Sequence, residues 1–155
     1  MKNESALNLW DVFLKTHPDV DPALTPKFQT FGTEGMLSIT ILDNILKGKA
    51  KGWIEPLLAI QCRGESLPVI GGFVLLVDSQ GRARAVIQIK TARLHPLFNV
   101  PQKNIELEGS GLKSLETWKT ANWDNLANQL KSFGKPLRES SIMVCTAFDL
   151  VFTGK

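Results

Sequence analysis

The chain has no long apolar run. Of its 155 residues 43% are hydrophobic and 21% are charged, as in an ordinary globular domain. No stretch approaches the roughly 18–20 apolar residues that a membrane-spanning helix needs. The first ten residues, MKNESALNLW, also lack the apolar core and the small-residue cleavage site of a secretory signal. The sequence therefore predicts one cytoplasmic domain without a membrane segment.

Cysteine and histidine are scarce. Cys62 and Cys145 do not form a CxxC pair, and both lie in apolar runs, so we expect buried thiols, with a disulfide or a reactive thiol as the alternative. His17 and His95 each precede a proline, which favours turn residues over a catalytic or metal-binding role. We therefore expect no metal and no cofactor.

The common catalytic and nucleotide-binding motifs are missing. The sequence contains no GxxxxGK[ST], GxGxxG, HExxH or GxSxG, which argues against P-loop nucleotide hydrolases, dinucleotide-binding enzymes, zinc proteases of the HExxH type and serine hydrolases. No Ser/His/Asp set is recognisable from spacing alone.

Positive charge is concentrated in the middle of the chain. Between residues 45 and 93 there are eight basic and three acidic residues, whereas the first 44 residues are acidic overall. A local basic patch attracts phosphates, although an ordinary solvated surface is the alternative. The densest part is LKGKAKGW, in which the lysines are Lys47, Lys49 and Lys51.

Apolar periodicity predicts four helices, at residues 5–16, at about 34–46, at 101–107 and from residue 114 to about 133. Ser5 and Ser114 are the expected N-caps of the first and the last of these helices. Gly48 is expected to end the second helix as a C-cap glycine. The three prolines of HPDVDPALTP indicate a loop after the first helix.

The strands are predicted mainly between residues 53 and 94. WIEPLLAIQC contains a proline and is predicted to be an edge or bulged strand. FVLLVD and ARAVIQIKTARL flank SQGR, which predicts a β-hairpin. SIMVCTAFDLVF predicts a buried central strand. This order of elements indicates an α+β fold, a small barrel or strongly bent mixed sheet with flanking helices.

Four segments, read in order, resemble the ASCH domain, a PUA-like β-barrel family. They are FGTEGMLSITILDNILKGKAKGW, LPVIGGFVLLVDSQGRARAVIQI, LEGSGLKSLETWKTANW and VCTAFDLVF. The resemblance covers about residues 31–152, and Trp10 fits the leading helix of longer members. It implies an N-terminal helix and loop over residues 1–30, packed on an ASCH-like domain over residues 31–155.

The resemblance also implies a function. The family is widely proposed to bind RNA, and its members include ribonucleases and amidohydrolases that deacetylate N4-acetylcytidine-type nucleosides. The amidohydrolases are held to use the lysine and threonine of G-x-K-x-x-T with a glutamate from an acidic-glycine segment. A lysine of lowered pKa serves as base or nucleophile, and a carboxylate transfers protons. A cleft beside the G-x-K turn is then expected to receive RNA or a modified nucleoside.

This sequence departs from the family pattern where that chemistry would occur. Ala50 stands at the lysine position and Trp53 at the threonine position. Gly72 replaces the aspartate of P-x-x-G-D, Ser110 replaces the second glutamate of EGEG, and Asn122 replaces a frequent histidine. A shift of one residue would let Lys49 or Lys51 supply an amine, but it would not restore the threonine.

The interpretation favoured by the sequence is a binding module for RNA or a modified nucleoside with a degenerate catalytic motif. The expected ligand-binding residues are Lys47, Lys49, Lys51, Trp53, Glu108 and Ser110. Trp53 could stack on a base, with core packing as the alternative. A hydrolase with a rearranged site, using Lys49 or Lys51 and Glu108, is the second hypothesis. The third is an interaction domain without a small ligand.

Overall fold

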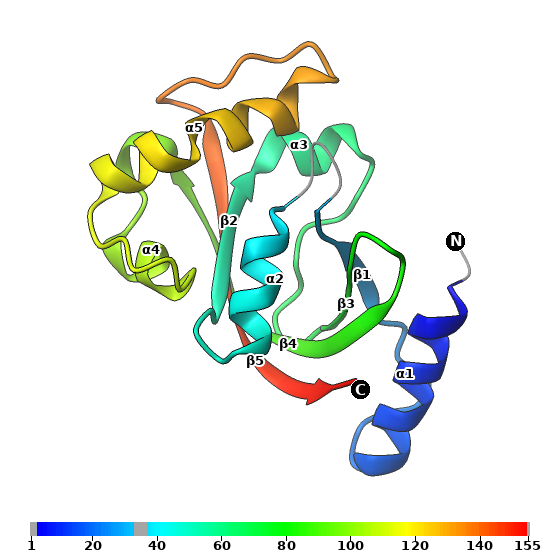
Figure 1. The fold of residues 1–155 in the computed structure, drawn as a ribbon. Coiled ribbons are helices and arrows are strands. Elements are labelled where there is room, and N and C mark those ends of the chain that lie inside the picture. Colours follow the sequence, from blue (N-terminus) through cyan, green and yellow to red (C-terminus); the bar gives the residue numbers. More distant parts are fainter. Residues whose placement is uncertain (1–2, 33–36, 155) are drawn as a thin grey trace.

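The structure is a computed structural model, and it describes residues 3–32 and 37–154 (Figure 1). Its helices are α1 (Glu4–Thr16), α2 (Ile39–Leu46), α3 (Leu57–Cys62), α4 (Gln102–Leu107) and α5 (Leu115–Lys131), with a 3-10 turn at Leu97–Asn99. Its strands are β1 (Lys27–Thr30), β2 (Gly52–Pro56), β3 (Phe73–Val77), β4 (Ala83–Pro96) and β5 (Ile142–Thr153).

The five strands form one mixed sheet in the order β1-β3-β4-β5-β2. β1 is parallel to β3, and the other pairs are antiparallel. Register shifts at two points of the β4–β5 ladder mark bulges, which bend and twist a sheet. The sheet curls into a half-barrel with helices around it (Figure 1), which confirms the predicted α+β class.

The curled sheet buries apolar side chains on both faces. On β3, Val74 and Leu76 belong to an inner cluster, whereas Leu75 belongs to an outer one. The inner cluster is completed by α2, which lies across the half-barrel between β2 and β1 (Figure 1). α1 covers the outer side of β3 and β4. α4 and α5 cover the outward side of β2 and β5. On the inner face, residues of β1 and β2 line a pocket.

The first helix is confirmed, but its predicted cap is wrong. Asn3 precedes α1 and accepts a hydrogen bond from the Ala6 N–H at 3.1 Å. The Ser5 hydroxyl instead accepts from the Ala83 N–H at 3.0 Å, which ties α1 to β4. β1 follows the proline-containing loop and was not predicted, because four residues are too few for a clear alternation. The division of the chain at residue 31 stays a prediction.

The second helix begins later than predicted. Ser38 caps α2 by accepting from the Thr40 N–H at 3.2 Å, and Leu37 pairs with Phe31 in an isolated parallel bridge. The predicted start at residue 34 lies outside the described residues. Gly48 follows the end of α2 with φ of +76°, a value that L side chains rarely adopt, so its predicted role at the helix end is confirmed.

The predicted strand over residues 53–62 is wrong in its second half. β2 ends at Pro56, and the next residue starts α3. Proline lacks an N–H, and its fixed φ of −66° suits the position just before a helix. The predicted edge position of β2 is confirmed, as are the hairpin, α4, α5 with Ser114 as its cap, and the interior position of β5.

Both cysteines are free thiols, and Cys145 is buried. His17 ends α1, but His95 lies within β4, so the prediction of a turn is wrong for His95. Among the described residues no helix is long and apolar enough to cross a membrane. The same residues contain no group of three or more His, Cys, Asp or Glu side chains placed to hold a metal ion.

Candidate ligand-binding pocket

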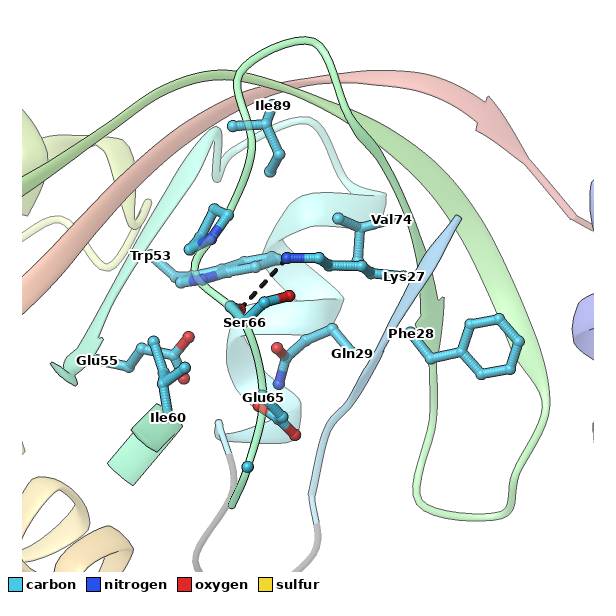
Figure 2. Close-up of a pocket in the computed structure, with 12 residues that line it drawn as sticks. Lys27, Phe28, Gln29, Trp53, Glu55, Ile60, Glu65, Ser66, Val74 and Ile89 are labelled. Atoms are coloured by element: carbon cyan, nitrogen blue, oxygen red, sulfur yellow. Dashed lines mark hydrogen bonds between the residues drawn. The ribbon is translucent and has the colours of Figure 1, made fainter. Parts of the chain in front are cut away.

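A cavity of about 350 Å³ opens at the inner face of the half-barrel. It lies between β1, β2 and the loop that follows α3. Figure 2 shows Trp53 and Glu55 of β2 facing Lys27 and Gln29 of β1, with the loop of Glu65 and Ser66 crossing between the strands. The other lining residues are Phe28, Ile60, Gly64, Pro68, Val74 and Ile89.

Trp53 reaches the pocket because of strand alternation. Successive residues of β2 point to opposite faces, so Trp53 joins the inner cluster and Ile54 joins the outer one. The indole packs against Phe31 and Phe148 with ring centroids 5.8 and 4.9 Å away, and the residue is 3% exposed. Within the described part of the chain its Nε1 has no hydrogen-bond partner. A buried indole N–H without an acceptor is uncommon, and here the residue that carries it lines a cavity.

Glu55 lies two residues further along β2 and is 4% exposed. Its Oε2 accepts from the guanidinium of Arg63 at 3.3 Å, and Arg63 also contacts Glu65 at 3.0 Å. Burial raises the pKa of Glu55 to about 7, although Arg63 acts in the opposite direction. The carboxyl group can therefore gain or lose a proton near neutral pH.

Lys27 joins β1 to the loop opposite. Its Nζ donates to the carbonyl oxygen of Leu67 at 2.6 Å. It also donates to that of Ser66 at 3.3 Å, the bond marked in Figure 2. Burial lowers the pKa of Lys27, while nearby Glu65 opposes this shift. The pocket thus contains an ammonium, a carboxyl and an amide on largely apolar walls that include the Trp53 indole, which is the usual composition of a small-molecule site.

The three lysines of LKGKAKGW lie elsewhere. Lys47, Lys49 and Lys51 are exposed and do not line the cavity, whereas Ala50 between them is buried in the inner cluster. The backbone of this segment is held by hydrogen bonds, one of which runs from the Lys51 N–H to the Leu107 carbonyl at 2.7 Å. Ligand binding by these lysines stays a prediction.

Glu108 and Ser110 are also outside the pocket. Glu108 is 5% exposed, and its oxygens accept from the Ile54 N–H at 2.9 Å and from Trp118 Nε1 at 2.7 Å. Burial raises the pKa of Glu108 to about 7, although the hydrogen bonds from Trp118 and Ile54 act to lower it. The exposed Ser110 hydroxyl accepts from the Leu112 N–H. Glu108 therefore links β2 to α5, and a catalytic or ligand-binding role for either residue stays a prediction.

Of the residues expected to bind a ligand, the structure brings only Trp53 to the cavity. Sequence reasoning missed Glu55, Arg63 and Lys27. One signal was available for Glu55. It is a carboxylate within the apolar run WIEPLLAI, and burying a carboxylate is costly unless it is paired or hydrogen-bonded. Lys27 carried no such signal, since it follows a loop and its partners are carbonyl groups 39 and 40 residues away.

Comparisons with known proteins support the fold. The chain is similar to protein EF3133 from Enterococcus faecalis V583, with a TM-score of 0.80, 18% identity and coverage of 97% of this chain and 90% of that chain. It is also similar to an ASCH domain from Lactobacillus crispatus JV V101, with a TM-score of 0.77, 20% identity and coverage of 96% and 95%. A search of curated proteins gives no match. The model of the ASCH domain family matches residues 27–152, so this chain belongs to the ASCH domain family.

Proposed function

We propose that this ASCH domain binds a nucleoside, or a nucleotide within RNA, by holding the base in the pocket between β1 and β2. The observation that carries the proposal is the pocket itself, in which the polar side chains of Lys27, Gln29 and Glu55 stand among apolar walls. A base offers an apolar ring to such walls and hydrogen-bonding groups along its edges to the polar side chains.

The dimensions and the walls of the pocket fit a base. A volume of about 350 Å³ is at the lower end of the range of small-molecule sites, roughly 300–1,000 Å³. Ile60, Val74 and Ile89 offer apolar surface to a ring, while Lys27, Gln29 and Glu55 offer polar groups to its edge. The packing of Trp53 against Phe31 and Phe148 buries its ring, so Trp53 contributes an apolar wall to the pocket rather than an exposed stacking surface.

Support for the amidohydrolase alternative is weaker. Ala50 and Trp53, at the positions of the family's lysine and threonine, are both buried in the inner cluster and supply neither an amine nor a hydroxyl. Lys49 and Lys51 are exposed, and Glu108 is engaged by Trp118 and the Ile54 N–H. We expect no hydrolysis of N4-acetylcytidine by the purified protein. Turnover that Glu108→Gln abolishes would instead support the hydrolase hypothesis.

The binding proposal is tested by titrating the protein with nucleosides and with short single-stranded RNA, followed by calorimetry. We expect saturable binding that Trp53→Phe weakens about threefold to tenfold, because the smaller ring removes apolar wall area from the pocket. Trp123→Phe is the control, because Trp123 is outside the pocket. Absence of binding to every nucleoside and RNA at low salt contradicts the proposal.

Variants of the exposed lysines Lys49 and Lys51 distinguish a free nucleoside from RNA as the ligand. If RNA is the ligand, the double variant Lys49→Ala/Lys51→Ala weakens RNA binding and reduces its dependence on salt, while nucleoside binding is unchanged. Lys131→Ala/Lys135→Ala removes two exposed lysines at the end of α5 and after it, and is the matched control. Equal effects of the two double variants would favour a free nucleoside as the ligand.

A further inference from the structure

One wall of the pocket is a loop. Residues 63–72 connect α3 to β3, and part of this loop crosses between β1 and β2 (Figure 2). Gly64, Glu65, Ser66 and Pro68 of the loop line the cavity. The other described lining residues belong to α3 and to strands β1 to β4. The loop is therefore the part of the wall that a ligand could displace without breaking a helix or a strand.

Few contacts hold the middle of this loop. Among the described residues no backbone–backbone hydrogen bond involves residues 66–68. The side chains of Leu67, Val69 and Ile70 are exposed, so they bury little apolar surface against the domain. A segment with few backbone hydrogen bonds and little apolar burial opens at a lower free-energy cost than the rest of a fold.

Both ends of the loop are fixed to the domain. At its start, the Glu65 N–H donates to the Ile60 carbonyl of α3 at 3.1 Å. At its end, the Gly71 N–H donates to the Ile89 carbonyl of β4 at 2.8 Å. Gly71 has a φ of +84°, and nothing lies within 4 Å of a Cβ added there. The chain can therefore change direction at Gly71, as hinge positions require, while residues 66–70 span two fixed points.

Lys27 of β1 holds this span in the middle. Its Nζ bonds to the carbonyl oxygens of Leu67 and Ser66 are charge-assisted, and such bonds are stronger than those between neutral groups. Among the described residues they are the only hydrogen bonds that join residues 66–68 to another element. One side chain thus fastens the loop across the pocket.

We propose that residues 66–70 form a gate over the pocket and that Lys27 is the latch that holds this gate closed. Opening breaks the two bonds from Nζ and lets the segment swing about Gly71, which widens the access between β1 and β2. Loops of this kind move on the microsecond-to-millisecond timescale and control the entry and release of ligands. The inference concerns access to the site of the proposed function, and it rests on that function only where a nucleoside is the probe.

A latch and a simple ligand contact predict different kinetics for Lys27→Met, which keeps an unbranched side chain and removes the charge and the donors. Loss of a ligand contact alone raises the dissociation rate constant and leaves association nearly unchanged. Loss of a latch raises both rate constants, because the ligand no longer waits for the gate to open. By stopped-flow fluorescence with uridine and adenosine, we expect association at least about threefold faster than in the wild type. Lys90→Met, which removes an exposed lysine of β4 outside the pocket, should leave both rate constants unchanged.

A measurement on the ligand-free protein tests the gate separately from the proposed function. ¹⁵N relaxation dispersion reports microsecond-to-millisecond exchange of individual amides. In the wild type we expect exchange in residues 66–70 and little exchange in the neighbouring strands. In Lys27→Met the minor, open state should become more populated, whereas Lys90→Met should show the wild-type pattern.

The outcomes separate the gate from the function of the pocket. Absence of exchange in residues 66–70 of the wild-type protein overturns the inference, and this result does not depend on whether a variant folds. Exchange that Lys27→Met leaves unaltered overturns it, as does association of a nucleoside that Lys27→Met does not accelerate. Exchange that Lys27→Met enhances, together with no binding of any nucleoside or RNA, supports the gate and contradicts the proposed function.

Discussion

Two tryptophans differ in what their indole N–H groups contact. Trp118 Nε1 donates to the buried carboxylate of Glu108 at 2.7 Å, on the side of β2 covered by α5. Within residues 3–32 and 37–154 Trp53 Nε1 has no partner, and Trp53 lines the pocket. The indole N–H of Trp118 therefore forms a hydrogen bond that links α5 to Glu108, whereas that of Trp53 makes no hydrogen bond within the described residues.

This difference predicts unequal effects of the same substitution. Trp118→Phe leaves a buried carboxylate oxygen without its donor and should lower the free energy of unfolding by about 1–3 kcal/mol more than Trp53→Phe. Chemical denaturation of the two variants measures the difference. Because both substitutions remove the same atoms, the comparison cancels the lost volume. Equal or reversed losses of stability would contradict the assigned contacts.

At the scale of single residues, the sequence predicts some members of the site and misses others. Trp53 could be chosen because the resemblance places it at a reactive position of the family motif. Glu55 and Lys27 could not be placed together, since their meeting depends on a sheet whose first strand has four residues. Glu108 could be chosen because it lies in the segment that resembles the family's acidic-glycine motif. Its contacts with Trp118 and β2 could not be predicted, because they depend on how α5 packs.

At the scale of elements, the lysine-containing turn before β2 is fixed against the turn after α4. The Lys51 N–H donates to the Leu107 carbonyl, and the backbone of Gly109 packs directly on that of Lys49. A Cβ at Gly109 would be 2.5 Å from the Lys49 carbonyl oxygen. This contact sets where β2 begins and thereby positions Trp53 and Glu55.

We therefore expect Gly109→Ala to be much more destabilising than Gly111→Ala. Both glycines have positive φ, of +74° and +86°, so both substitutions carry the conformational cost of roughly 1 kcal/mol for a non-glycine residue. At Gly111 nothing lies within 4 Å of an added Cβ, which makes it the matched control. Thermal melting measures the difference. Similar melting temperatures for the two variants would show that the two turns are not in contact.

Elements with a clear period were predicted and those without one were not. The β3–β4 hairpin, α1 and α5 have apolar residues at the spacing of two or of three to four that their structures require. The sequence predicts a strand over α3 because its six residues continue the apolar composition of β2, whereas in the structure the chain turns from strand to helix at Pro56. The strand pairing of β1 follows from a contact with β3, more than 40 residues later.

For the whole molecule, two buried carboxyl groups predict how stability changes with pH. Burial raises the pKa of both Glu55 and Glu108 to about 7, above the value of about 4.3 in an unfolded chain. Between these values the folded protein binds more protons than the unfolded chain, so stability falls as pH rises from about 4.5 to 7. Asp78 does not contribute to this decrease. Burial acts to raise its pKa, but hydrogen bonds from the N–H groups of Arg82 and Gln80 lower it below its usual value.

Urea denaturation between pH 5 and pH 8 tests this expectation. We expect the free energy of unfolding to decrease on the order of 1–3 kcal/mol over that interval. Glu55→Gln should show a smaller decrease, because the amide does not titrate. An increase of stability with pH over the same interval would show that the two carboxyl groups are ionised throughout and that burial has less effect than their donors.

The central claim is that a base binds beside Trp53, and the indole N–H resonances test it most directly. The chain has four tryptophans, so a ¹⁵N-labelled sample gives four indole signals, which single Trp→Phe variants assign. On titration with uridine we predict a saturable shift of the Trp53 signal, while those of Trp10, Trp118 and Trp123 stay nearly unchanged. Saturable binding that leaves the Trp53 signal in place, or no shift with any nucleoside or short RNA, would contradict the account.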